Sequence, residues 1–164
     1  MLVVAKIGTV LVLTVIAWQD FKERQIWWFL VPLFAILGTY LFYTHSSSMQ
    51  HYGTALLINA GLVLLILLVL YSYVRWVLRK NFLQEAFGLG DVLCLIAFAV
   101  SLPTLSFLYF LVSALFFSFL LNGILKLVLR NQPKSVPLAG TISLFLVFVY
   151  AAHWMGWLES LYFL

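Results

Sequence analysis

The chain has 164 residues, of which 65% are hydrophobic and only 9% are charged, and its mean hydropathy is +1.13. A soluble domain carries about 25% charged residues because its surface must be solvated, so this composition excludes a soluble globular protein and indicates a membrane protein. The net charge of +4 comes from basic residues that are not gathered in one stripe, which argues against a nucleic-acid-binding protein. The single cysteine, Cys94, and the lack of a Cys/His cluster predict neither a disulfide nor a metal site.

Five apolar stretches are candidates for membrane spans, since about 20 residues are needed to cross about 30 Å of hydrocarbon. The first lacks a small-residue cleavage site before the polar segment that follows, so we expect a retained span rather than a signal peptide. The fourth, residues 92–129, would be about 57 Å long as one helix. It contains turn chemistry at Ser-Leu-Pro-Thr, residues 101–104, which divides it into two. The predicted spans are residues 2–18, 26–43, 54–74, 92–102, 105–129 and 136–157.

The basic residues predict the orientation of these six spans. Eight of the nine Lys and Arg residues fall in loops on one side, and cytoplasmic loops are enriched in such residues. We therefore expect that side to face the cytoplasm and both termini to lie outside. Merging the fourth and fifth spans would move Lys126, Arg130 and Lys134 to the opposite side, so the charges independently favour the split. The sequence predicts one all-α domain, a polytopic protein of the inner (plasma) membrane with six transmembrane helices in contact with lipid.

Two of the five acidic residues lie at the predicted cytoplasmic ends of spans. Asp20 follows the first span, and Asp91 opens the fourth. An acid at the edge of the hydrocarbon is costly unless it is partnered or functional, and the topology brings both residues to one face. Two close carboxyls share a proton, so one can act as a base on water while the other donates to a carbonyl oxygen. The pair predicts an aspartyl protease site that requires neither a metal nor an organic cofactor.

Gly88 and Gly90 directly precede Asp91. Glycine accepts backbone angles that other residues avoid, and it lets another chain approach closely. We expect an extended substrate to lie beside this loop. Asp91 would then face that substrate from a helix N-terminus, where the helix dipole favours a carboxylate.

Three segments resemble known family motifs. Residues 88–92, Gly-Leu-Gly-Asp-Val, resemble the GxGD signature of intramembrane aspartyl proteases. Asp20, followed six residues later by Ile26, is similar to the first catalytic segment of the type IV prepilin peptidases, where an Asp precedes an Ile-Pro pair. Residues 136–140, Val-Pro-Leu-Ala-Gly, are similar to that family's Pro-containing apolar motif. The resemblance covers essentially the whole chain, although Trp27 replaces the usual Pro and Leu93 replaces a Lys found in many members.

The resemblance implies a membrane-embedded endopeptidase that removes the basic leader of type IV prepilins or pseudopilins at the cytoplasmic face. Family members cut after a Gly at the junction of leader and apolar helix. Asp20 and Asp91 would be catalytic, Gly88, Gly90 and Pro137 would belong to the site loops, and Glu85 is a candidate contact for the leader. Many bacterial members also methylate the new N-terminus and carry an insert with paired CxxC motifs. This chain has neither the insert nor the cysteines, so methyltransferase activity is not expected.

Two other functions fit parts of the same pattern. A small transporter or channel also uses intramembrane acids, but it predicts acids near the middle of the bilayer and helices broken there. A catalytically inactive scaffold of the same fold is the second alternative. His45, His51 and His153 all fall on the predicted outer side, so none is expected to serve an inner-face site.

Overall fold

The computed structural model describes the chain except for residues 47, 80–87, 129–136, 159–160 and 163–164. Glu85, the candidate leader contact, lies outside the described residues. Every described element is helical, as the sequence predicts. In chain order these are α1 (Leu2–Glu23), α2 (Leu30–His45), α3 (Met49–Tyr73) with a π-helical continuation η1 (Val74–Leu78), α4 (Leu89–Val100), α5 (Thr104–Val128) and α6 (Leu138–Trp154).

Three of these helices are long and apolar enough to cross a membrane: Leu2–Glu23, Met49–Trp76 and Thr104–Ile124. The other three are apolar but shorter, with 16, 12 and 17 residues in α2, α4 and α6. The described part of the chain therefore has the helices of a membrane protein. Among the described residues, six α-helices overlap the six segments predicted from the sequence.

The predicted division of the long fourth stretch is confirmed. α4 ends at Val100 and α5 begins at Thr104. The hydroxyl of Ser101 donates to the carbonyl oxygen of Ala97 (2.6 Å), and Pro103 has no backbone N–H with which to continue α4. Both features end the helix at the expected turn.

The first helix is longer than its apolar stretch, and it ends at Glu23 rather than near Trp18. Arg24 adopts a left-handed conformation (φ 57°), and its N–H donates to the carbonyl oxygen of Asp20 (3.2 Å). This is the usual geometry at a helix C-terminus. Asp20 consequently lies in the last turn of α1, and not in a loop after it.

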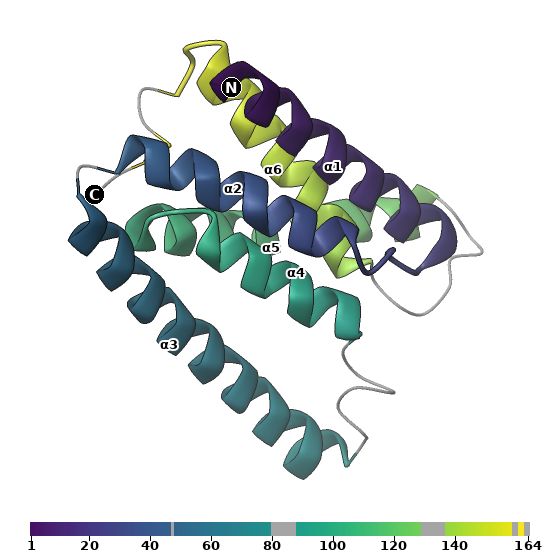
Figure 1. Cartoon of the computed structure of the whole chain (residues 1–164). Helices are drawn as coiled ribbons and strands as arrows, with labels where there is room; N and C mark the ends of the chain where they lie inside the picture. The colour runs from purple at the N-terminus through teal and green to yellow at the C-terminus, as the bar shows by residue number, and fades with distance from the viewer. Residues whose placement is uncertain (47, 80–87, 129–136, 159–160, 163–164) are drawn as a thin grey trace.

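A compact group of helices surrounds a core that includes Ile16, Phe34, Phe98 and Leu146, all fully buried. α1 packs on α2 and α6, and α2 packs on α4. In Figure 1, α3 runs away from this group toward its C-terminal end. Only Asn59 and Val63 of α3 are buried.

Asn59 joins α3 to the α4–α5 turn. Its side-chain amide donates to the carbonyl oxygens of Ala99 (2.7 Å) and Leu102 (2.9 Å). A close approach between α2 and the same turn depends on Gly38, because a Cβ there would lie 2.5 Å from the Cβ of Ser101. The end of α4 that is remote from Asp91 is thus held by two neighbouring helices.

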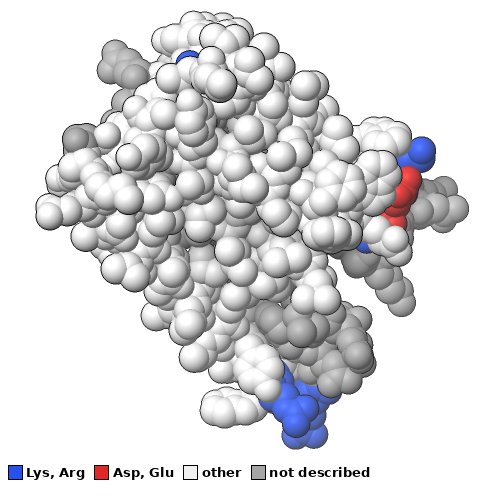
Figure 2. Space-filling view, viewed as in Figure 1, with Lys and Arg blue, Asp and Glu red and all other residues white. Residues whose placement is uncertain are grey.

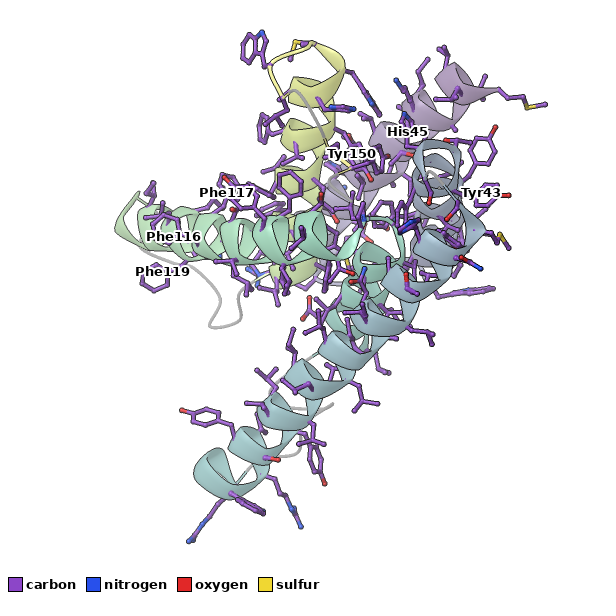
Figure 3. The ribbon with its side chains drawn as sticks, turned by 90° about the vertical axis from the view of Figure 1, so that its left-hand side faces the viewer. Tyr43, His45, Phe116, Phe117, Phe119 and Tyr150 are labelled. Atoms are coloured by element: carbon purple, nitrogen blue, oxygen red, sulfur yellow. The ribbon has the colours of Figure 1, made fainter. Side chains whose placement is uncertain are left out.

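The surface is mostly apolar. Figure 2 shows the described charged side chains at the margins of the molecule, with a broad uncharged surface between them. In Figure 3, Phe116 and Phe119 project outward from α5, and they are 63% and 78% exposed. Large exposed apolar side chains on long helices are the arrangement that lipid contact requires.

Candidate active site

Asp20 and Asp91 lie at the same end of the helical group. Asp20 is in the last turn of α1 and is 7% exposed, whereas Asp91 is in the first turn of α4. Figure 1 shows the C-terminal end of α1 on the same side of the molecule as the N-terminal ends of α4 and α6. The structure therefore brings together two carboxyls that are 71 positions apart in the sequence.

The start of α6 connects the two carboxyls. The backbone N–H of Ala139 donates to Oδ1 of Asp91 (2.8 Å), and the next N–H, that of Gly140, donates to Oδ2 of Asp20. Oδ1 of Asp91 and Oδ2 of Asp20 each accept a hydrogen bond from one of two adjacent backbone nitrogens. The two oxygens therefore lie at most about 9 Å apart, which is the sum of the two hydrogen-bond lengths and the distance between neighbouring nitrogens. The two acids share one helix N-terminus.

The N-terminus of α6 has backbone N–H groups that no residue of the helix itself accepts. The first N–H groups of an α-helix have no partner within the helix, and the N-terminus carries a partial positive charge. In α6 the first intrahelical bond runs from Thr141 N–H to the carbonyl oxygen of Pro137 (3.1 Å). The amides of Ala139 and Gly140 precede that bond and so remain available for the carboxylates. Pro137, which has no N–H, is the buried N-cap residue of α6.

Gly140 gives Asp20 the space that this contact needs. A Cβ at position 140 would lie 2.9 Å from both Cβ and Oδ2 of Asp20, a distance at which one helix must move. Gly140 belongs to the same sequence motif as Pro137, but the resemblance predicts a site role only for Pro137. No local pattern marks Gly140, because its neighbour lies 120 residues away.

The glycines of the GxGD segment lie directly before Asp91. Neither Gly88 nor Gly90 has a positive φ, so neither position uses the backbone freedom that glycine offers. Gly88 has an ordinary extended conformation (φ −70°, ψ 144°), and Gly90 belongs to α4. Both glycines instead leave room for neighbouring side chains. A Cβ on Gly90 would lie 3.3 Å from Cδ1 of Ile26, and one on Gly88 would lie 3.4 Å from Oδ2 of Asp91.

A cavity of about 350 Å³ opens between these elements. The loop after α1 and the start of α4 form its walls, and Asp20 and Asp91 both line it. Since one water occupies about 30 Å³, the cavity holds several waters or part of a peptide. The lining residues are Asp20, Arg24, Gln25, Ile26, Gly88, Leu89, Gly90 and Asp91.

Trp27 is held by a contact that a proline at this position could not make. The backbone N–H of Trp27 donates to Oε1 of Gln19 (3.3 Å), whose side chain is 1% exposed. A proline could not make this bond because it lacks the N–H. Gln19, which the sequence analysis did not single out, therefore holds the loop after α1 from the position next to Asp20.

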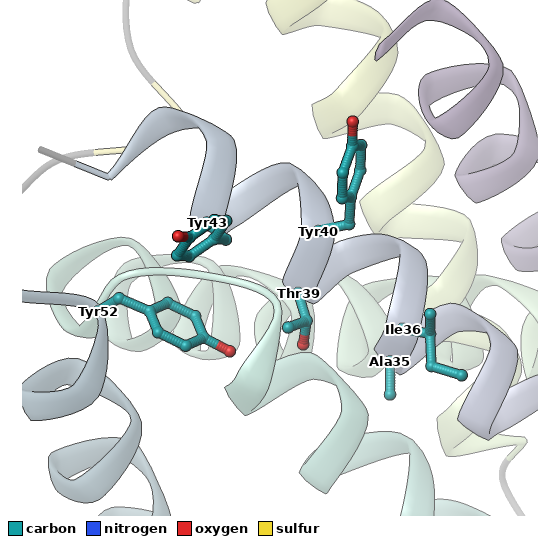
Figure 4. Close-up of a pocket in the computed structure, with 6 residues that line it drawn as sticks. All are labelled: Ala35, Ile36, Thr39, Tyr40, Tyr43 and Tyr52. Carbon is teal, nitrogen blue, oxygen red and sulfur yellow. The ribbon is translucent and has the colours of Figure 1, made fainter. Parts of the chain in front are cut away.

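Other hollows in the molecule lie away from these carboxyls. Figure 4 shows one of about 490 Å³ that is lined from α2 and α3 by Ala35, Ile36, Thr39, Tyr40, Tyr43 and Tyr52. Another, of about 570 Å³, lies between α3 and α4. Neither is lined by a carboxylate, a histidine or a cysteine. Among the described residues, no three His, Cys, Asp or Glu side chains cluster as metal ligands would.

The histidines are also separate from the cavity. The ring of His45 stacks on Tyr162 with centroids 4.5 Å apart, and His153 packs against the same ring at 6.2 Å. Both belong to the C-terminal ends of their helices, α2 and α6, whereas the cavity lies at the N-terminal end of α6.

Comparison with known proteins adds no relative. No family model matches the chain, and no curated protein or solved structure matches it. The likeness to the type IV prepilin peptidases therefore stays a prediction, and it rests on the three sequence motifs and on the geometry around Asp20 and Asp91.

Proposed function

We propose that this protein is a membrane-embedded aspartyl endopeptidase of the type IV prepilin peptidase kind. The observation that carries the proposal is the pairing of Asp20 and Asp91 on consecutive amides of one helix N-terminus, beside a shared cavity. A protease of this class needs two close carboxyls and a space for water and peptide between them. The GxGD motif supplies one of the two acids.

The proposed reaction uses one ionised and one protonated carboxyl. The ionised carboxylate removes a proton from water as the water oxygen attacks the peptide carbonyl carbon. The protonated partner donates to the carbonyl oxygen, and the tetrahedral intermediate collapses when the leaving nitrogen is protonated. Each carboxyl keeps one oxygen on an α6 amide, which holds the pair in position for reaction with substrate and water.

The proposed substrate is a prepilin or pseudopilin precursor, as the motif resemblance suggests. Such a precursor has a basic leader in the cytoplasm and an apolar helix in the bilayer. The cavity is polar and lies at the helix ends, whereas the surface beside it is apolar. This arrangement suits a bond at the junction of a polar and an apolar segment.

We propose six spans, with both termini outside the inner membrane and the cavity facing the cytoplasm. Single cysteines at two exposed positions test this orientation: Gln50→Cys before the third span and Glu23→Cys at the end of the first. An impermeant maleimide added to intact spheroplasts is expected to label Gln50→Cys and to spare Glu23→Cys until the membrane is opened. The native Cys94 is fully buried, so its background labelling is low. The reverse pattern would contradict the orientation.

A cleavage assay tests the function. The purified protein in detergent, incubated with a prepilin precursor, is expected to release the basic leader, with the new N-terminus identified by mass spectrometry. A matched precursor with Val in place of the Gly before the junction should be cut at least about tenfold more slowly, since a crowded site discriminates side chains by about 1–3 kcal/mol. Failure to cut any prepilin or pseudopilin precursor would contradict the proposal.

The position of the acids argues against a transporter or channel. Both carboxyls lie within one turn of a helix end, whereas a transport site at the midplane would place them inside the spans. Flux of ions in proteoliposomes without cleavage of any precursor would reverse this judgement. A correctly folded protein with neither activity would support the inactive scaffold.

A further inference from the structure

A polar network lies in the apolar interior behind the two carboxyls. Ser118 of α5 and Thr141 of α6 are 3% and 0% exposed, and their hydroxyl oxygens are 2.9 Å apart. Oγ1 of Thr141 also lies 2.9 Å from the carbonyl oxygen of Leu138 and 3.1 Å from that of Pro137. Asn122, one turn further along α5, directs its side-chain amide at the carbonyl oxygen (2.7 Å) and the hydroxyl (3.4 Å) of Ser118.

The hydroxyl of Thr141 has one hydrogen, which it can donate to Oγ of Ser118 or to the carbonyl oxygen of Leu138 or Pro137. The side-chain amide of Asn122 can only donate to Ser118. The network therefore joins α5 to the first turn of α6 through the hydroxyl of Thr141.

The network ends on a peptide group that touches the site. The carbonyl of Leu138 and the N–H of Ala139 belong to the same planar peptide unit, and that N–H donates to Oδ1 of Asp91 (2.8 Å). A hydrogen bond accepted by the carbonyl polarises the unit and strengthens its N–H as a donor, because linked hydrogen bonds reinforce one another. The hydroxyl of Thr141 therefore acts on Asp91 through one peptide unit.

We infer that Ser118 and Thr141 are positioning residues that orient the Leu138–Ala139 peptide toward Asp91 and strengthen its hydrogen bond to that carboxyl. A threonine hydroxyl that bonds back to its own helix is common and needs no function. Here the buried bond between the hydroxyls of Thr141 and Ser118 also ties the Thr141 side chain to a second helix. We call this path, from the Thr141 hydroxyl through the Leu138–Ala139 peptide to Asp91, the relay. Its effect on kcat rests on the proposed peptidase function.

The test uses two substitutions at Thr141 and a matched control. Thr141→Val keeps the branched shape but removes the hydroxyl, and it is expected to lower kcat about tenfold with little change in KM, as the loss of one buried hydrogen bond would. Thr141→Ser restores the hydroxyl and should retain at least about half of the wild-type kcat. The control is Thr9→Val in α1, because Thr9 is also fully buried and bonds back to Ala5 (2.8 Å), but no second helix contacts its hydroxyl in any described hydrogen bond.

A second measurement does not depend on cleavage. Dicyclohexylcarbodiimide modifies protonated carboxyls, and mass spectrometry can follow its reaction at Asp91 and Asp20 separately. In Thr141→Val the labelling rate of Asp91 is expected to rise several-fold, while that of Asp20 stays as in Thr9→Val. Equal labelling of Asp91 in the two variants, or an equal loss of kcat, would overturn the relay. If the wild type cuts no precursor but Asp91 labelling still responds to Thr141→Val, the relay stands and the peptidase function fails.

Discussion

Asp20→Asn and Asp91→Asn are each expected to lower the rate of precursor cleavage by at least about a thousandfold. One carboxyl must take a proton and the other must give one, and a positioned acid or base contributes about 10²–10⁴ to a rate. An amide side chain can do neither. The two carboxyls act as a unit, so the double variant should cleave at nearly the same rate as the slower of the two single variants.

The same substitutions should leave the fold intact. Asn keeps a carbonyl oxygen that can accept the α6 amide bonded to each Asp, and it removes a charge from a largely buried position, which lowers the cost of burial. We therefore expect unchanged circular dichroism and an equal or higher unfolding temperature in detergent. Glu23→Gln is the matched control, because Glu23 is an exposed acid on the same turn of α1 as Asp20; its rate should stay within about twofold of wild type. Cleavage that persists in either Asp variant would contradict the paired mechanism.

Much of the fold follows from the sequence, because long apolar segments favour helices that lie in or along a membrane. The six apolar segments correspond to the six helices, and the turn near Pro103 was recognisable from its residues. Helix ends were less predictable. α1 continues past the apolar stretch to the left-handed Arg24, since capping geometry and not hydropathy ends a helix.

The site was only partly predictable, and for a physical reason. Asp20 and Asp91 stand out because acids at the edge of an apolar segment are rare. The donors that hold them are backbone N–H groups of Ala139 and Gly140, and a backbone group leaves no signature in the sequence. The same holds for the space around Gly140, which is defined by a side chain from another helix.

The shared helix end also explains how two acids can be neighbours at all. Two carboxylates repel each other, and burial disfavours both charges. The N-terminus of α6 offsets part of this cost with two amides and the positive end of its dipole. A helix start with unused donors is therefore as necessary to the proposed site as the acids are. It follows that substitutions on α6 should affect activity even though α6 contributes no carboxylate.

Gly140→Ala is the strongest such substitution and is expected to lower the cleavage rate at least about a hundredfold. The added Cβ would lie 2.9 Å from Cβ and Oδ2 of Asp20, and since the Cβ of Asp20 is fixed to its backbone, α6 and α1 must separate. Displacements of about 1 Å at a catalytic group cost about 10² in rate, and overpacking a buried contact costs about 1–3 kcal/mol of stability.

The control for this variant is Gly61→Ala in α3, a helical glycine with no atom within 4 Å of the added Cβ. Without a clash, alanine should stabilise that helix by about 0.5–1 kcal/mol, so the two variants are expected to shift the unfolding temperature in opposite directions. The comparison separates the general effect of alanine in a helix from the specific contact with Asp20. A Gly140→Ala protein that cuts at the wild-type rate would show that the bond between α6 and Asp20 is not needed for catalysis. The two carboxyls would then be held together by a contact other than the helix end that they share.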